Sequence, residues 1–281
     1  MSISIDQAFI KQYEAEVHEA YQQRGSKLRH TVRLKTGVEG KSTTFQKVGK
    51  GTAGQKTRHG NVPVMNIDHT PVECTLEDWY AGDWVDKLDE LKTNIDERQV
   101  QVNAGAFALG RKIDSLIITA ARSGLSSDQK VAEGSAGLTK SKILQAFELL
   151  NDADVPDDGQ RYAIVGAHQW NELLNITEFK SADYVGASEL PWLAGTQAKR
   201  WLNMIWIMHT GLPVSSGTRY CLMYHRTALG LAEGITGVWT DITWHGDKAA
   251  HFVDNAISAG AVRIDSTGIV EIACDDDAAI S

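Results

Sequence analysis

The chain has 281 residues, of which 42% are hydrophobic and 23% are charged, and its formal net charge is −8. This composition is typical of a globular protein with a sizeable core, and it excludes a wholly disordered chain. Three widely separated cysteines (Cys74, Cys221 and Cys274) argue against a disulfide framework or a zinc site and predict a reducing, cytoplasm-like environment. Residues 1–22 show no secretion signal, and no apolar run approaches the ~20 residues of a membrane span.

The charge is distributed unevenly along the chain. Residues 24–58 contain ten basic residues and one acid, Glu39, and therefore carry +9, whereas the remaining 18 basic and 35 acidic residues sum to −17. A segment of this kind binds polyanions or an acidic protein surface, such as the rest of this same protein. The alternative is a solvated loop that is basic without a partner.

The N-terminal residues 5–23 predict an amphipathic helix. Phe9, Tyr13 and Val17 recur at four-residue steps on one face, and Arg24-Gly25 is a suitable helix end. One short helix with an apolar stripe is marginal alone, so the stripe packs either on its own domain or on a neighbouring molecule.

Residues 28–75 predict a long two-stranded excursion. The segments LRHTVRLKTG and STTFQKVGKG are strand-like, a Gly/Lys-rich tip follows, and VPVMNIDHTPVECTL returns as an extended segment. The section has few large apolar residues, and an isolated two-stranded ribbon is not stable in water, so we expect it either to be mobile or to be held by a second molecule. The basic residues with which it would contact that molecule are Arg33, Lys35, Lys41, Lys47, Lys50, Lys56 and Arg58.

The tip contains Gly49, Gly51 and Gly54 in the spacing of a dinucleotide-binding turn and nearly of a P-loop. Both sites need a helix directly after the glycines, and the sequence QKTRHGNVP cannot open one, because Val62-Pro63 favours extended backbone. The nine histidines are scattered, and the acids Asp83, Asp86, Asp89 and Glu90 are interpreted as a solvated helix face rather than a metal site. We therefore predict no catalytic, cofactor or metal site.

A long helix is predicted at about 94–123. It begins with a capping-box-like Thr93 and Asp96, continues with Val102, Ala106 and Leu109 at helical spacing, and would be about 43 Å long. A coiled coil is the competing interpretation, but alanine and glycine replace leucine in the seam.

The rest of the chain mixes helices and strands without a βαβ repeat, which predicts an α+β fold. We expect helices after Thr139, at 168–175 and around 249–257. Strands are expected at 161–166, 203–210, 219–225, and as a closing pair in AGAVRID and TGIVEIAC.

In this order the parts resemble the major capsid proteins of tailed bacteriophages, which share the Hong Kong 97 fold. KSTTFQKVGKGTAGQKTRHG is similar to the extended loop of that family, HTPVECTLEDWYAGDWVDKLDELKTNIDERQVQVNAGAFALGRKIDSLI to the return into its spine helix, and AISAGAVRIDSTGIVEIACDD to its closing strands. The resemblance implies an N-terminal arm (1–30), an extended β-hairpin loop (31–76), a peripheral domain with the spine helix (77–156), an axial domain (157–235), and a return to the peripheral domain (236–281).

The resemblance also implies the partners. These are further copies of the chain in the hexamers and pentamers of an icosahedral shell, packaged double-stranded DNA, and portal, scaffolding or cement proteins, with no membrane. The protein would be made in the cytoplasm of a bacterial host and reside in the virion capsid. Two rivals are a DNA-binding protein that uses residues 24–58, and an enzyme with a site in 160–235, where His168, His209 and His225 lie.

Overall fold

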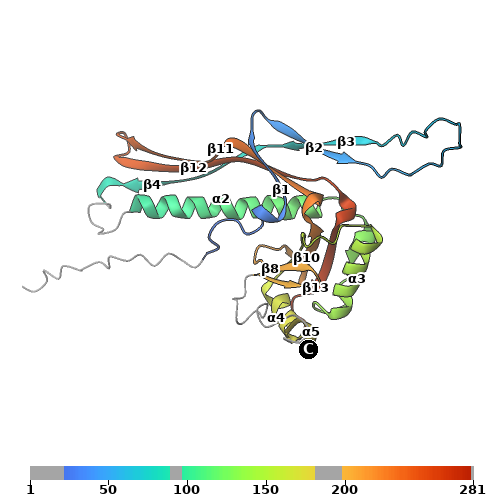
Figure 1. Cartoon of the computed structure of the whole chain (residues 1–281). Helices are drawn as coiled ribbons and strands as arrows, with labels where there is room; N and C mark the ends of the chain where they lie inside the picture. Colours follow the sequence, from blue (N-terminus) through green and yellow to red (C-terminus); the bar gives the residue numbers. More distant parts are fainter. Residues whose placement is uncertain (1–21, 89–96, 181–197, 280–281) are drawn as a thin grey trace, which may run out of the picture.

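The computed structural model describes residues 22–88, 97–180 and 198–279. It has an elongated layer, formed by a long helix under a sheet, and a compact body below one end of that layer (Figure 1). The predicted α+β class is confirmed. The short 3₁₀ helices are η1 (Arg29–Thr31), η2 (Ser127–Gln129), η4 (Arg226–Ala228) and η5 (Ser266–Gly268).

The elongated layer is built on helix α2 (Glu97–Arg122), which agrees with the predicted long helix over the described residues. Above it lies a four-stranded sheet in the order β1 (Arg33–Val38), β11 (Leu229–His245), β12 (Ala250–Arg263) and β4 (Glu77–Asp86). β1 runs parallel to β11, and the other neighbours are antiparallel. The small Gly105 of α2 allows close approach, since a Cβ there would lie 2.2 Å from the amide nitrogen of Asn255 on β12.

The compact body is a second sheet with helices packed on it. Its strands are β5 (Lys130–Val131), β13 (Ile269–Asp275), β10 (Thr218–His225), β6 (Arg161–Val165), β8 (Met204–Met208) and β7 (Ala198–Trp201), with β9 (Val214–Ser215) beside β10. The helices are α3 (Lys140–Asp152), α4 (Ala167–Asn175) and α5 (Thr177–Lys180). Ile164, Trp206 and Leu222, each at most 1% exposed, belong to the main core of the protein.

The third sheet is the two-stranded ribbon β2 (Ser42–Val48) and β3 (His69–Thr75). Residues 49–68 connect the two strands and project away from the rest of the molecule (Figure 1). The strand-like segment before Gly40 is not part of this ribbon, because β1 pairs with β11 instead. The excursion therefore begins at Ser42, later than predicted.

Two local predictions are wrong. The helix expected around 249–257 is the first part of β12, where Val253, Asn255 and Ile257 are buried at a period of two. A strand is the stable form because β12 is paired on both sides. Asp83 and Asp86 lie in strand β4 and not on a helix, whereas Asp89 and Glu90 lie outside the described residues.

The sheets divide the chain differently from the predicted domain boundaries. Strand β5 and helix α3, expected with the long helix, belong to the compact body. The closing strands do not pair with each other, since β12 pairs with β11 and β4, and β13 with β10 and β5. The elongated layer therefore contains 33–38, 77–86, 97–122 and 229–263, and the final strand returns to the body.

Candidate inter-subunit surfaces

The ribbon β2–β3 is anchored at its base and free at its tip. Phe45, which is 2% exposed, packs beside Cys74 in a small apolar cluster that the ribbon shares with the sheet. The ribbon and the long sheet lie so close together that a Cβ at Gly260 of β12 would be 2.0 Å from the carbonyl oxygen of Thr75, at the end of β3. Residues 51–59, by contrast, are all exposed. The prediction of a ribbon without a core therefore holds for the tip and not for the base.

Two of the predicted contact lysines pair within their own chain. Lys47 Nζ lies 2.9 Å from Asp265 Oδ1, and Lys50 Nζ lies 2.8 Å from Asp154 Oδ2. Burial alone would raise the pKa of Asp265, but hydrogen bonds from Lys47 and Thr267 hold that pKa below its ordinary value. Both partners of the Lys50 pair are highly exposed, so this pair contributes little to stability.

The other predicted contact residues fall into three groups. Arg33 and Lys35 lie beside the ribbon base, where the Arg33 guanidinium is 5.7 Å from the Phe45 ring centroid and Lys35 donates to Thr43. Lys41, Lys56 and Arg58 are exposed, and their side chains form no hydrogen bond or ion pair with another residue that the structure describes. Phe9, Tyr13 and Val17 lie outside the described residues.

The sheet face opposite α2 is a second exposed surface, which the sequence reasoning missed. It carries the aromatic side chains of Tyr80, Trp84 and Trp239, which are 69%, 39% and 47% exposed. Lys248 Nζ lies 3.8 Å from the Trp84 ring centroid. A signal was present in the alternation of Asp78, Tyr80 and Trp84 along β4, which is typical of a strand with one outward face.

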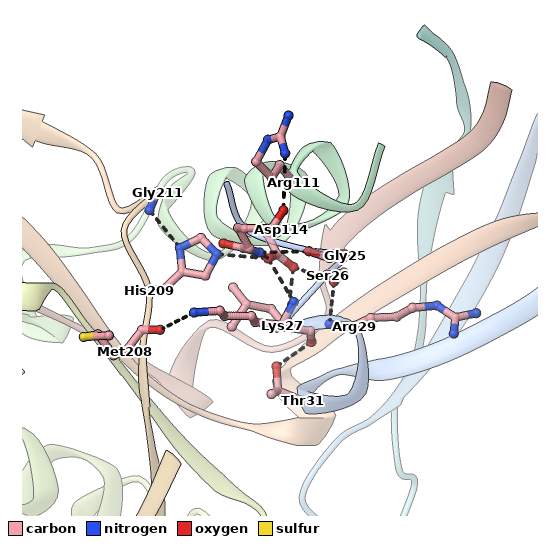
Figure 2. A network of polar contacts seen from close by, with 12 residues as sticks. Gly25, Ser26, Lys27, Arg29, Thr31, Arg111, Asp114, Met208, His209 and Gly211 are labelled. Atoms are coloured by element: carbon pink, nitrogen blue, oxygen red, sulfur yellow. Dashed lines mark hydrogen bonds and ion pairs between the residues drawn. The ribbon is translucent and has the colours of Figure 1, made fainter. Parts of the chain in front are cut away.

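A buried polar network connects residues 26–28, which precede β1 and the ribbon, to helix α2 and to the compact body (Figure 2). Asp114 of α2 accepts hydrogen bonds from the backbone N–H groups of Lys27 and Leu28, both at 3.0 Å, and from the Ser26 hydroxyl. His209, which follows β8 in the compact body, has Nε2 at 2.9 Å from the same carboxylate. Burial would raise the pKa of Asp114, but the hydrogen bonds together hold that pKa below its ordinary value.

A second tie lies close by. Arg29 donates from Nε and Nη2 to the two carboxylate oxygens of Glu233 on β11, at 2.6 Å each. Hydrogen bonding to Glu233 outweighs desolvation and raises the pKa of Arg29. Because Glu233 is only 3% exposed, this bidentate pair fixes the segment before β1 on the sheet. The start of the extended loop is thus held rigidly, and its tip is not.

The family of the chain follows from its sequence as a whole. Residues 5–276 match the family model described as phage capsid protein. The chain belongs to the phage capsid protein family. A comparison with curated protein sequences finds no match.

Solved phage capsids have the same fold as this capsid protein. The capsid of cyanophage P-SCSP1u is 16% identical, with a TM-score of 0.72 over 97% of this chain and 94% of the other. The capsid of Ralstonia phage GP4 is 11% identical, with a TM-score of 0.72 over 98% of both chains. A structure from Mycobacterium phage Che8 is 16% identical, with a TM-score of 0.69 over 96% of this chain and 98% of the other. The predicted Hong Kong 97-like capsid fold is therefore confirmed over the full length.

The capsid protein is a structural component of a phage head and not an enzyme. Neither rival interpretation has support from the comparisons. The three histidines proposed for an enzyme site lie in separate contacts: His209 with Asp114, His225 with Asp158, and His168 with the carbonyl oxygen of Ala278. In the described residues, no helix is long and apolar enough to cross a membrane, and no group of three or more His, Cys, Asp or Glu could hold a metal ion.

Proposed function

We propose that this capsid protein assembles into hexamers and pentamers of an icosahedral head around double-stranded DNA. The loop between β2 and β3 reaches over an adjoining subunit, and portal, scaffolding or cement proteins complete the particle. Synthesis takes place in the cytoplasm of the bacterial host. The glycine-rich stretch in the loop is then a contact element rather than a phosphate-binding turn.

The names peripheral and axial domain fit the two parts of the structure with revised boundaries. We assign the peripheral domain to 77–124 and 229–264, around α2 and the long sheet. The axial domain comprises 125–228 and 265–281, around the second sheet. This assignment rests on strand pairing, because β5 and α3 belong with β13 and not with α2.

One observation supports this proposal above the others: the two-stranded ribbon ends in a cationic tip whose Lys56 and Arg58 side chains have no partner among the residues that the structure describes. Lys56 and Arg58 are exposed, while Lys47 and Lys50, nearer the base, form ion pairs within their own chain. The rest of the protein is acidic, so a second copy offers the complementary charge. A contact of one surface with a different surface on the next copy builds rings and shells.

The test is assembly of the purified protein, followed by light scattering and negative-stain electron microscopy. The wild type is expected to form shells, and the double variant Lys50→Glu with Lys56→Glu to remain unassembled while its circular dichroism is unchanged. Lys130→Glu with Lys140→Glu makes the same change in net charge on the compact body and is the control. Normal-sized particles from the Lys50 and Lys56 variant would contradict the role of the loop.

A further inference from the structure

The outer face of the long sheet, opposite α2, contains a shallow hollow of about 410 Å³. Tyr80, Ala256 and Trp239 lie in one row across β4, β12 and β11, since Ala256 pairs with both neighbours. Adjacent strands are about 4.8 Å apart, so the two aromatic residues stand about 10 Å apart with only a methyl group between them. The row therefore forms a notch with an aromatic wall on each side.

Carboxylates border the notch in both neighbouring rows. Asp78 pairs with Ser258 on one side, and Asp254 pairs with Asp241 on the other. Residues two positions apart on a strand are about 7 Å apart, so these acids are within reach of a group seated in the notch. None of the three acids forms an ion pair with a residue in the described part of the chain.

Aromatic walls with carboxylates at the rim are suited to a lysine or arginine side chain. A cation within about 6 Å of a ring centroid is attracted by the ring face, and an acid adds charge and hydrogen bonding. The same sheet face already holds one cation in this way, where Lys248 lies over Trp84. Apolar residues on the partner would cover the remaining aromatic surface.

The extended loop of the capsid protein has this combination. Lys56 and Arg58 are exposed and unpaired within the described residues, and the returning arm exposes Val62 and Val64 at 72% and 80%. A chain cannot fill its own notch in the structure seen here, because the loop projects from one end of the layer while β4, β11 and β12 extend toward the other (Figure 1). The occupant must come from a second copy.

We propose that the notch between Tyr80 and Trp239 receives Lys56 or Arg58 from the loop of a neighbouring copy, with the rim acids as their counter-charges. This inference rests on the proposed function, because it specifies where the loop of one subunit contacts the next. The contact lies beside the base of the receiving subunit's own ribbon, which packs on the same face at Gly260.

The first experiment is a charge exchange scored by particle yield in electron micrographs. Asp78→Lys with Asp254→Lys is expected to lower the yield at least tenfold. Adding Lys56→Glu and Arg58→Glu to the same chain is expected to restore at least half of the wild-type yield. Asp128→Lys with Asp152→Lys, on the compact body, makes the same charge change away from the notch and is expected to leave the yield within twofold.

The second experiment is cross-linking, and it needs no interpretation of yield. The natural cysteines are all buried, so a variant with Ala256→Cys and Arg58→Cys has only two accessible thiols. Air oxidation of assembled particles is expected to give a ladder of covalently linked chains, whereas each single variant gives at most a dimer. If the wild type forms particles but the charge exchange restores no yield and the double-cysteine variant gives no ladder, the notch contact is overturned and the proposed function remains intact. A cross-link confined to single chains would also overturn it, and failure of the wild type to form any particle would refute the proposed function itself.

Discussion

Replacing Asp114 by alanine tests whether the buried network holds residues 26–28, which precede the ribbon, on the long helix α2. The substitution leaves the backbone N–H groups of Lys27 and Leu28 without an acceptor, and each such buried group costs about 1–3 kcal/mol. It also removes the partner of the buried His209. Losing one member of a buried charged network costs about 3–5 kcal/mol, and we expect a decrease of this size in the free energy of unfolding.

The measurement is urea unfolding of unassembled subunits, followed by tryptophan fluorescence, with thermal unfolding as a second probe. A loss of 3–5 kcal/mol corresponds to a decrease of about 10 °C in Tm for a protein of this size. Asp152→Ala, which removes an exposed carboxylate from α3, is the control and is expected to change stability by less than about 0.5 kcal/mol. A loss below about 1 kcal/mol for Asp114→Ala would refute the reasoning.

The pH dependence provides an independent check on the same residue. Because the folded pKa of Asp114 lies below the ordinary value of about 3.9, its charged form stabilises the fold fully above about pH 4. That contribution disappears as the pH falls through the lower folded pKa. The difference in stability between the wild type and Asp114→Asn is therefore expected to be constant from pH 5 to 7 and to shrink below about pH 4.

Three further changes test the ribbon base and the C-terminal segment. Phe45→Ala is expected to destabilise the subunit by about 3 kcal/mol or more, because the ring is almost fully buried, and urea unfolding checks this. Gly260→Ala places a Cβ against the carbonyl oxygen of Thr75 and is expected to increase proteolysis of the displaced ribbon, whereas unchanged cleavage rates would contradict the close approach. Arg219 holds the pKa of Asp276 at about 2, so Arg219→Gln is expected to raise that pKa toward 3.9 in an NMR titration, and an unshifted value would show that the ion pair does not set it.

Sequence reasoning succeeded where the pattern was local and periodic. The helical spacing of Val102, Ala106 and Leu109 predicted α2 almost to its observed end, because a long helix satisfies its hydrogen bonds within one segment. The loop was predicted from its charge and its lack of large apolar residues. Neither inference needed to know which distant segment lies alongside.

It failed where a strand takes its partner from elsewhere in the chain. Asn255 interrupts the apolar alternation of β12, and this polar residue is buried because the Thr240 hydroxyl donates to it, at 2.8 Å, and because it donates to Ala81. Both partners come from neighbouring strands, so no local window contains the explanation. The sequence also placed β13 in the wrong part of the molecule for the same reason, because its position in the compact body depends on pairing with β10 across more than forty residues.

The polar interactions fall into two sets: buried charges that stabilise the folded subunit, and charges without an ion-pair partner in the described residues that are available for contact with a neighbouring subunit. The carboxylates of Asp114 and Glu233 are buried and fully engaged, so they fix the geometry of one chain. The cations at the loop tip are exposed, and the acids at the notch rim are exposed or half-buried. None of these charges forms an ion pair within the described residues, so they contribute little to the fold. Exposed charges of opposite sign act over about 10 Å and guide the orientation and rate of association more than its final affinity. A chain that buries one set of charges and leaves another set unpaired at opposite ends has the physical properties of a subunit that folds first and assembles afterwards.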